Sequence, residues 1–509
     1  MKLVLYNPPS NATRKPVLPM SLLALGAVLE GTHEYRIVDG NLEADPLAAL
    51  TVAIRALDAR VLGVTVMPGP QLFDAVPTCR ALKVRFPQLT IVWGGYFPTQ
   101  HYEPCLRSDF VDVVVRGHGE LAFKAWLDTF ERGEEWRAIP GLAYRKSPTS
   151  STAAGTLLQL GSSEEGSEAV TTPLPPIPHP DRLPDFPYHR LDLGRYVRST
   201  FLGRRTLAHH SSYGCPFFCS FCAVVNMVNG RWLAQSAERT ARTVRWLAEE
   251  WQVDAVEFYD NNFFVQEART REFAERIKDL GISWWGEARI DTMLKYPDRT
   301  WELMRASGLK MVFLGAESGS DETLKRMNKG GTASTAKTLE IAEKMRRYGI
   351  IPEFSFVLGN PPDPVGDARQ TVEFIRRVKR TNPSAEIILY TYTPVPLAGE
   401  LYDQAKASGF QFPETLDEWI NPRWQEFAQR RNIHVPWVKD PLRAELHDFE
   451  RVLNAYYPTA TNPNLSGWRR QALRAASAWR YHLRLYHYPI ELRALHRLLG
   501  YQRPETSGF

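Results

Sequence analysis

The sequence predicts an α/β protein in three parts: a doubly wound parallel sheet, a partial (β/α)6 barrel, and a mostly helical C-terminal region. Two stretches, 1–146 and 193–400, alternate short apolar runs with helical patterns, which is typical of parallel sheets covered by helices. Between them, over 147–192, Ser, Thr, Gly, Glu and Pro dominate, which predicts a linker. The remaining residues, 401–509, are expected to form a helical domain.

The chain has 509 residues, which is too long for one hydrophobic core, and its 44% hydrophobic and 23% charged residues are ordinary for a globular protein. A net charge of +5 is too weak to indicate a nucleic-acid partner. Five cysteines exclude a disulfide framework. The first residues, MKLVLYNPPSN, lack the apolar core of a signal peptide, and no apolar run reaches 18 residues, so a cytoplasmic location without a membrane span is expected.

The first stretch predicts a flavodoxin/Rossmann-like sheet. Strands are expected at Lys2–Tyr6, Tyr35–Val38, Val61–Val66, Leu89–Trp93 and Val111–Val115, with helices at Leu18–Glu30, Pro46–Leu57, Leu72–Phe86 and near Glu120–Phe130. Ligands of such sheets bind beyond the carboxyl ends of the strands, where glycines let a large ligand approach the backbone. The candidate ligand contacts there are Thr65, Met67, Gly94, Gly95, Tyr96, Gly117 and Glu120.

The second stretch predicts six strand–helix units. The expected strands are Thr206–Tyr213, Ala255–Tyr259, Ser283–Ala288, Lys310–Gly315, Glu353–Leu358 and Ile387–Tyr390, and Ser236 is expected to cap the first long helix. Active sites of such barrels lie at the carboxyl ends of the strands. The candidate site residues at those ends are Asp260, Arg289, Glu317, Ser318 and Gly359.

A cysteine motif follows the first strand of the second stretch. The run SSYGCPFFCSFC places Cys215, Cys219 and Cys222 at C-x-x-x-C-x-x-C spacing. Thiolate clusters select zinc or iron–sulfur centres, and a structural zinc ion takes four protein ligands. The other cysteines, Cys79 and Cys105, lie more than a hundred residues upstream. Three cysteines therefore suit a 4Fe-4S cluster with one iron open, and a zinc knuckle or three unrelated buried thiols are the alternatives.

This loop resembles the cluster motif of the radical S-adenosylmethionine (SAM) superfamily, including Phe221 before the last cysteine. The resemblance implies that SAM chelates the open iron, that Asp260 contacts its amino group, that Glu317 and Ser318 contact ribose and carboxylate, and that Gly359 lies on the adenine side. Arg289 is expected to pair with the SAM carboxylate. The structural alternatives are a Glu317–Arg289 ion pair across the barrel mouth and a helix-capping Asp260.

The N-terminal part resembles the cobalamin-binding domains that precede radical SAM cores in one subgroup. Gly94-Gly95 and the Arg116–Glu120 run match that subgroup, although His118 stands where an acidic residue is common. Many cobalamin domains carry an Asp-x-His-x-x-Gly loop, whereas Asn7–Lys15 has no histidine. Cobalamin is therefore expected to bind without a protein imidazole, with its lower face covered by the Thr65–Leu72 loop. The alternative is a flavodoxin-like domain without a cofactor.

The resemblance covers roughly residues 1–400 and implies a cobalamin-dependent radical SAM enzyme. Such an enzyme takes an electron from a flavodoxin- or ferredoxin-type donor, cleaves SAM reductively, and here is expected to methylate an unactivated carbon of a small-molecule or lipid substrate. The alternatives are an oxidative cyclase of the anaerobic magnesium-protoporphyrin IX monomethyl ester cyclase type and a non-catalytic cluster or cobalamin sensor. A methylthiotransferase needs a second set of cluster cysteines, for which Cys79 and Cys105 are too few.

The C-terminal region carries no motif. Gly467–Arg503 holds eight arginines, no lysine and one acid, Glu491, and Pro489 is expected to separate two helices. Apolar residues recur there at helical spacing: Leu473, Ala476, Trp479, Leu483 and Tyr486. A basic amphipathic helix pair has two interpretations, a peripheral membrane contact or a pair docked on the barrel with a solvated basic face.

Overall fold

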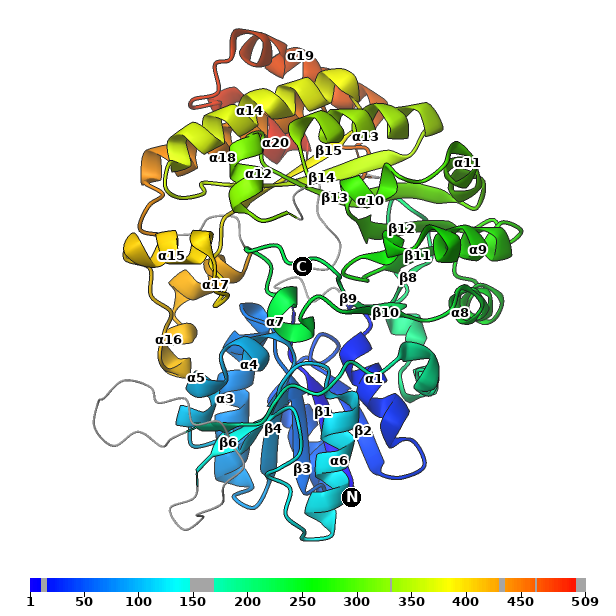
Figure 1. The fold of residues 1–509 in the computed structure, drawn as a ribbon, viewed down its shortest axis with the longest axis vertical. Helices are drawn as coiled ribbons and strands as arrows, with labels where there is room; N and C mark the ends of the chain where they lie inside the picture. Colours follow the sequence, from blue (N-terminus) through cyan, green and yellow to red (C-terminus); the bar gives the residue numbers. More distant parts are fainter. Residues whose placement is uncertain (11–15, 147–168, 330–331, 430–434, 463–464, 500–509) are drawn as a thin grey trace. The chain divides into compact units, whose positions relative to one another are not determined.

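A computed structural model of the chain describes residues 1–10, 16–146, 169–329, 332–429, 435–462 and 465–499 (Figure 1). Its contacts form two compact units. Unit 1 comprises Met1–Tyr196, Ala223–Ala234 and Gln411–Gln429, and unit 2 comprises Val197–Cys222, Gln235–Phe410 and the described residues after 434. The units interleave along the chain, and the four-segment division at 146, 192 and 400 stays a prediction.

Unit 1 is built on a seven-stranded sheet with the order β2-β1-β3-β4-β5-β6-β7. The first five strands are parallel, and their order, with β1 between β2 and β3, is that of flavodoxin-like folds, as expected. Two short antiparallel strands that the sequence did not indicate extend the sheet, and one of them lies in the expected linker. The strands are β1 Lys2–Asn7, β2 Glu34–Asp39, β3 Val61–Thr65, β4 Thr90–Gly94, β5 Val113–Val115, β6 Leu142–Arg145 and β7 Ala169–Thr171.

Helices cover both faces of this sheet. On one face, α1 (Met20–Leu29) and α6 (Gly119–Glu131) pack in a core that contains the fully buried Trp126. On the other, α2 (Pro46–Leu57) and α3 (Pro70–Arg85) bury further aliphatic side chains. Asp45 caps α2 by accepting from the Ala48 amide, and proline occupies the first turn of both α2 and α3, where no amide donor is needed.

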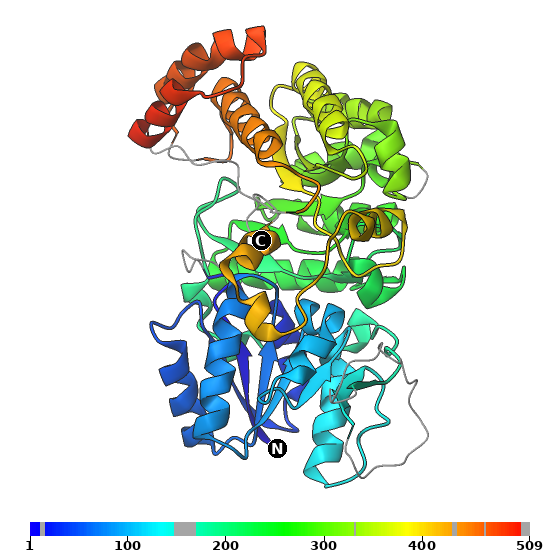
Figure 2. The same cartoon turned by 90° about the vertical axis from the view of Figure 1, so that its left-hand side faces the viewer.

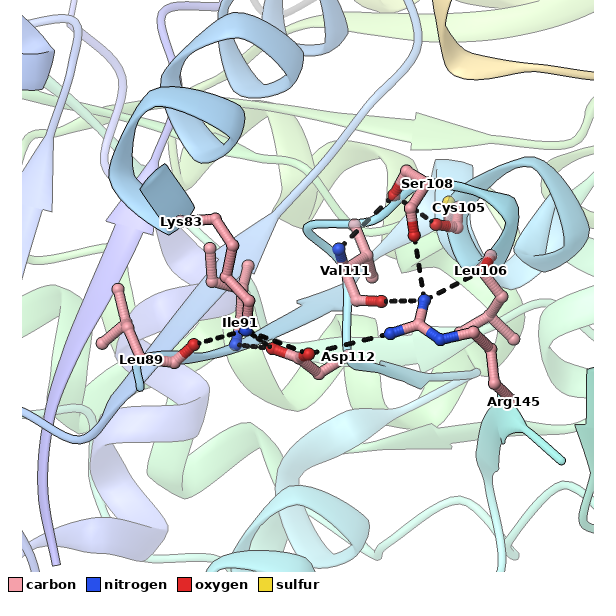
Figure 3. Close-up of polar contacts among 9 residues, drawn as sticks. All are labelled: Lys83, Leu89, Ile91, Cys105, Leu106, Ser108, Val111, Asp112 and Arg145. Atoms are coloured by element: carbon pink, nitrogen blue, oxygen red, sulfur yellow. Dashed lines mark hydrogen bonds and ion pairs between the residues drawn. The ribbon is translucent and has the colours of Figure 1, made fainter. Parts of the chain in front are cut away.

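A polar network fixes the amino-terminal edge of the same sheet, as Figure 3 shows. Asp112, just before β5, accepts from Lys83 Nζ at 2.8 Å and from the Ile91 amide at 2.7 Å. Arg145 Nη1, on β6, donates to three backbone carbonyls, those of Leu106, Ser108 and Val111. These bonds hold the α5–β5 connection (α5, Tyr102–Arg107) at the edge away from the expected ligand site.

Unit 2 contains a six-stranded, all-parallel sheet in sequential order, β8-β11-β12-β13-β14-β15, as the six predicted units require. The strands are β8 Thr206–His209, β11 Ala255–Phe258, β12 Ser283–Ala288, β13 Leu309–Glu317, β14 Ile351–Leu358 and β15 Glu386–Thr391. The longer helices between them are α8 Ala237–Trp251, α9 Glu267–Ile277, α11 Asp298–Ala306, α13 Thr335–Tyr348 and α14 Pro364–Thr381, and two short helices, α10 Ile290–Met293 and α12 Asp321–Arg326, follow β12 and β13. Ser236 caps α8, as predicted, by accepting from the Arg239 amide.

The two faces of the barrel sheet differ in chemistry. The outer face packs on helices through aromatic contacts, with Trp284 at 5.4 Å from Phe273 of α9. On the inner face, Trp285 packs with Ala255 and Met311 and donates its indole N–H to Glu353 at 3.1 Å. Side chains of successive residues alternate between faces, so the interior of the partial barrel carries both aromatic and carboxyl groups.

The C-terminal residues divide between the units. In unit 1, Trp419 packs at 5.0 Å from the Phe97 ring. In unit 2, α18, α19 and α20 lie together beside α14 (Figure 2). Pro489 separates α19 from α20, as predicted, and no helix in the described ranges is long and apolar enough to cross a membrane. The helices are α15 Glu400–Ala407, α16 Leu416–Trp419, α17 Pro422–Gln429, α18 Asp440–Tyr456, α19 Gly467–Leu483 and α20 Ile490–Leu499.

Candidate functional site

The three motif cysteines follow β9 (Ser212–Gly214) in one loop of unit 2. Gly214 has a φ of +80°, a left-handed conformation that glycine adopts without steric cost. The Cys222 amide donates to the Cys219 carbonyl at 3.1 Å, which turns the chain between the last two cysteines. Cys219 is buried, and Cys215 and Cys222 are half-buried.

The cluster loop, residues 215–222, is tied to the residues that end α12 (Asp321–Arg326) and follow it. The Ser220 amide donates to the Met327 carbonyl at 3.0 Å, and Ser220 Oγ donates to the Arg326 carbonyl at 3.1 Å. Asn328 Nδ2 donates to the Phe218 carbonyl at 2.9 Å. The backbone of the loop is therefore fixed from one side, independently of its thiols.

Arg289, at the end of β12, reaches the same loop. Its Nη1 donates to Cys219 Sγ at 3.3 Å, and its guanidinium lies 3.8 Å from the centroid of the Phe217 ring. Asp291 accepts from Nε and Nη2 at 3.0 and 3.1 Å, and the Lys329 carbonyl accepts from Nη2 at 2.8 Å. Every nitrogen of this buried guanidinium therefore has an acceptor, which fixes its orientation toward the thiol.

Burial and nearby charges both change the pKa values of the motif cysteines. Burial raises the pKa of the Cys219 thiol, and the positive charges of Lys329 and Arg289 oppose that rise. Burial also raises the pKa of Cys215, whose Sγ accepts from Asn262 Nδ2 at 3.9 Å. A bound iron–sulfur cluster carries negative charge on its thiolates, so cations and N–H donors at the sulfurs favour it.

The donor set fits a 4Fe-4S cluster. Three thiols share one loop, and N–H groups of Arg289 and Asn262 reach two of the sulfurs. Within the described ranges, no three Cys, His, Asp or Glu side chains converge on a point where they would ligate one metal ion. A four-iron cluster takes one cysteine per iron, so it does not require the thiols to meet at a single point.

Glu317, at the end of β13, pairs with Lys329 rather than with Arg289, so the ion pair suggested as an alternative does not form. Glu317 Oε1 lies 2.5 Å from Lys329 Nζ, and both side chains are buried. Glu317 has a φ of +63°, in the left-handed region, at a bulge in the β13–β14 pairing. The pair neutralises both charges next to the loop.

Ser318 and Gly359 lie at neighbouring strand ends. Ser318 Oγ, fully buried, donates to Asp367 Oδ1 at 3.1 Å, on α14. Gly359, with φ +73°, accepts from Trp437 Nε1 at 2.9 Å, and an added Cβ would lie 2.9 Å from Val438. Ser318 Oγ and the Gly359 carbonyl therefore already form hydrogen bonds within the protein. The SAM contacts of both residues stay predictions.

Asp260, after β11, is fully buried beneath the start of the cluster motif. Its carboxylate accepts from the Ser211 amide at 2.7 Å, from Ser211 Oγ at 2.6 Å and from Ser212 Oγ at 2.7 Å. Arg269 Nη2 donates to Ser211 Oγ at 2.7 Å. Asp260 therefore holds the residues leading to Cys215, and a contact with the SAM amine stays a prediction.

In unit 1, adjacent strands bring most of the candidate cobalamin contacts to one sheet edge. Thr65 pairs with Gly94, and Gly94 pairs with Val115 just before Gly117. Gly95 has a φ of +96°, and an added Cβ would lie 3.0 Å from Thr65 Oγ1. Tyr96 begins α4 (Tyr96–Gln100) directly after these glycines, and the side chain of Met67 is exposed. A glycine-lined edge of this kind fits a large planar ligand.

Two side chains without a recognisable sequence signal organise this edge. Thr99 Oγ1 donates to the Gly95 carbonyl at 2.7 Å and accepts from the Gly117 amide at 3.0 Å. Gln71 accepts from the Met67 amide at 2.9 Å and donates to Asn7 Oδ1 at 2.8 Å. Glu120, in the first turn of α6, is buried, and its Oε1 lies 3.9 Å from His118 Nδ1.

Comparison with known families decides the identity. A model of the Radical SAM superfamily matches residues 210–375, and a model of the B12 binding domain matches residues 12–127. Together the two models cover more than half of the chain and include the cluster loop and the glycine-lined edge. The chain belongs to the cobalamin-dependent radical SAM enzymes. Its radical SAM domain implies a 4Fe-4S cluster and SAM, and its B12-binding domain implies cobalamin.

Relatives of this radical SAM enzyme extend over most of its length. An uncharacterized methyltransferase of Pyrococcus horikoshii is 27% identical over 74% of this chain and 78% of the relative. The anaerobic magnesium-protoporphyrin IX monomethyl ester cyclase of a Synechocystis species is 27% identical over 69% of this chain and 67% of the relative. The radical SAM methyltransferase TsrM of Kitasatospora setae, solved with cobalamin and a [4Fe-4S] cluster, has a similar fold, with a TM-score of 0.64 at 15% identity over 98% of both chains.

Proposed function

We propose that this radical SAM enzyme transfers a methyl group to an unactivated carbon of a small-molecule or lipid substrate. The observation that carries the proposal is the cluster loop, in which Cys219 is held against Arg289 at the carboxyl ends of the barrel strands. The methyltransferase among its relatives supports methyl transfer as the reaction. A flavodoxin- or ferredoxin-type protein is the proposed electron donor.

The proposed cluster ligands are Cys215, Cys219 and Cys222. When bound, the cluster and SAM supply a carbon-centred radical, and cobalamin supplies the methyl group. In unit 1, the proposed cobalamin contacts are the backbone at Gly94, Gly95 and Gly117 together with Thr65, Met67, Tyr96 and Glu120. We expect Asp260, Arg289, Glu317, Ser318 and Gly359 to define the SAM side of the site.

The chain's own residues orient and protect this chemistry. Arg289 directs an N–H donor at one thiolate, which lowers the cost of a negative cluster in a buried site, and Lys329 offsets the negative charge of Glu317 beside it. Asp260 and Ser220 hold the loop from its two ends through hydrogen bonds that do not involve sulfur. A rigid loop keeps the open iron in one position, which a radical reaction needs to avoid side products.

The barrel interior supports a substrate with some polar groups. Glu287 lies on its inner face near the carboxyl end of β12, and Glu353 lies on the same face nearer the amino end of β14; neither makes an ion pair with any residue that the structure describes. Burial raises the pKa of each to about 8, so both carboxyls are largely protonated near neutral pH and can donate a hydrogen bond. Tyr259, Trp285 and Phe313 supply apolar surface beside them.

Oxidative ring closure is the second candidate function, because a magnesium-protoporphyrin ester cyclase is among the relatives at 27% identity. Product mass distinguishes the two: methylation adds one CH₂ unit to the substrate, whereas the cyclase reaction forms a ring and incorporates oxygen.

The first test is anaerobic reconstitution with iron, sulfide and hydroxocobalamin, followed by reduction with SAM and chromatography for 5′-deoxyadenosine. The matched variants are Cys219→Ala and Cys105→Ala, because Cys105 is also buried but belongs to unit 1 and is not part of the motif. We expect cleavage in wild type and Cys105→Ala, none in Cys219→Ala, and cobalamin retained in all three. Cleavage without retained cobalamin would remove the methyl-transfer proposal, and a fully loaded cluster that never cleaves SAM would indicate a sensor.

A further inference from the structure

The last two helices expose an unusual amount of apolar surface. Residues 467–499, here called the C-terminal hairpin, consist of α19, a turn and α20. They hold as many exposed large apolar side chains as the rest of the described chain together, with exposed fractions from 47% for Trp479 to 81% for Leu498. These side chains are Trp468, Trp479, Leu483, Leu485, Tyr488, Ile490 and Leu498.

In α19 the exposed apolar residues form one stripe. Each helical residue advances by about 100°, so Trp468, Trp479 and Leu483 fall within about 60° of one another. The opposite side is buried against the protein through Leu473, Ser477 and Tyr481, whose ring stacks 4.4 Å from that of Tyr456 on α18. The helix is therefore apolar on the side that packs on the protein and again on the side that faces away from it.

The rest of the hairpin continues this surface. Ile490 and Leu498 lie eight residues apart on α20, on the same side of the helix, whereas Leu492 is fully buried. The turn between the helices is held by Arg480, which pairs with Glu491 and donates to the backbone carbonyls of Leu485, His487 and Tyr488. The exposed turn residues thus belong to a hydrogen-bonded structure rather than to a frayed helix end.

The charge of the hairpin restricts what can cover it. It contains seven arginines, no lysine and no aspartate, and its only acid, Glu491, is already paired with Arg480. Arg484 and Arg493 each have an acidic partner on another helix, yet their side chains remain 59% and 46% exposed. Arginine binds phosphate groups well, and tryptophan and tyrosine concentrate where lipid headgroups meet acyl chains. A basic helix pair with an outward apolar stripe matches a surface that is anionic outside and apolar beneath.

We propose that the C-terminal hairpin docks this enzyme on an anionic lipid surface. The hairpin lies in the interface, with Trp468, Trp479 and Leu483 entering the acyl boundary and the arginines remaining among the headgroup phosphates. No helix that the structure describes is suited to span the bilayer, so the contact is peripheral. The proposal rests on α19 and α20 alone and does not depend on which reaction the barrel performs.

The test is flotation of the full-length, cofactor-loaded protein with vesicles of phosphatidylcholine containing about a third phosphatidylglycerol, compared with pure phosphatidylcholine vesicles. We expect at least about tenfold tighter binding to the anionic vesicles, and a steep loss of binding as salt rises. Trp479→Ser combined with Leu483→Ser should weaken the binding about tenfold or more. The matched control is Val52→Ser combined with Val84→Ser, two exposed valines on α2 and α3, which should bind like wild type.

Charge is tested separately with Arg474→Gln and Arg497→Gln, two exposed arginines without an acidic partner among the described residues. Each substitution should cost about fivefold on anionic vesicles and nothing on neutral ones. Circular dichroism and the cobalamin absorption spectrum verify that the variants fold. The proposal is overturned if wild type does not bind anionic vesicles, or if the Trp479→Ser, Leu483→Ser variant binds them as well as the valine control does. It is also overturned if the Trp479→Ser, Leu483→Ser variant changes only the oligomeric state in light scattering, because the hairpin would then be a contact between copies of this chain.

Discussion

Replacing Glu353 by glutamine should make the stability of the protein less dependent on pH. Glu353 is 2% exposed on the inner face of β14, and its Oε2 accepts from Trp285 Nε1. Burial raises its pKa from 4.5 to about 8, with further contributions from the neighbouring carboxylates of Glu386, Glu287 and Glu257, while the Trp285 hydrogen bond opposes the rise. Glutamine keeps the shape and the acceptor oxygen, and it has no proton to lose.

The sign and size follow from the two pKa values. Between pH 4.5 and about 8 the folded chain still holds the proton that the unfolded chain has released, so the contribution of Glu353 to stability falls as the pH rises. Each pH unit in this window is worth about 1.4 kcal/mol. Raising the pH from 5.5 to 7.5 should therefore favour Glu353→Gln over wild type by about 2 to 3 kcal/mol, which corresponds to an upward shift of several degrees in relative Tm.

The assay is thermal unfolding of wild type and Glu353→Gln, without cofactors and at one scan rate, at several pH values across this window. Glu287 and Glu386 titrate in both proteins, so their contributions largely cancel in the difference. Glu340→Gln, on the exposed side of α13, is the matched control and should show no pH-dependent difference from wild type. A Glu353→Gln advantage that stays constant from pH 5.5 to 7.5 would refute the reasoning.

Three further predictions concern the cofactor sites. Lys329→Met should leave the buried Glu317 carboxylate unpaired and lower stability by about 3 kcal/mol in thermal unfolding. The double variant with Glu317→Gln should recover most of this stability. No recovery would show that the loss does not come from the broken ion pair. Gly95→Ala should lose cobalamin on gel filtration while SAM cleavage persists. The control is Gly133→Ala, which is also at positive φ but has open space around it and should retain cobalamin. Equal loss of cobalamin in both variants would point to backbone strain alone. Asp260→Asn should cost about 2 kcal/mol in stability and reduce iron loading, because a carboxylate that accepts three hydrogen bonds is replaced by a group with one acceptor oxygen. Unchanged iron content would show that Asp260 does not support the cluster loop.

The strands and the cluster loop were accessible from sequence for a physical reason. Buried parallel strands are short continuous apolar runs, and the cysteine spacing is local, so both leave a pattern within a few residues. Lys329, Asp291, Gln71 and Thr99 left no such pattern. Each acts through a side-chain hydrogen bond or ion pair whose partner is set by the fold, and a single charged or polar residue in a loop carries no period.

The C-terminal hairpin shows a different limit. The apolar spacing predicted a helix correctly, yet Trp479 and Leu483 lie on its exposed side while Leu473 is buried. Periodicity detects that a helix has an apolar side, and it does not tell whether that side meets the protein. The same limit applies to Asp260 and Ser318. Their positions at strand ends follow from the sequence, but their hydrogen-bond partners, Ser212 and Asp367, do not.

The interleaving of the two compact units limits how this enzyme can be taken apart or recombined. The chain enters unit 2 at Val197, returns to unit 1 for Ala223–Ala234, re-enters unit 2, and contributes Gln411–Gln429 to unit 1 again. A truncated protein of residues 193–400 would still contain Ala223–Ala234, which belong to unit 1, and would lack the described C-terminal helices of unit 2. A chimera that exchanges the cobalamin domain with a relative must therefore carry three separate segments, and a single crossover near the linker would join mismatched halves.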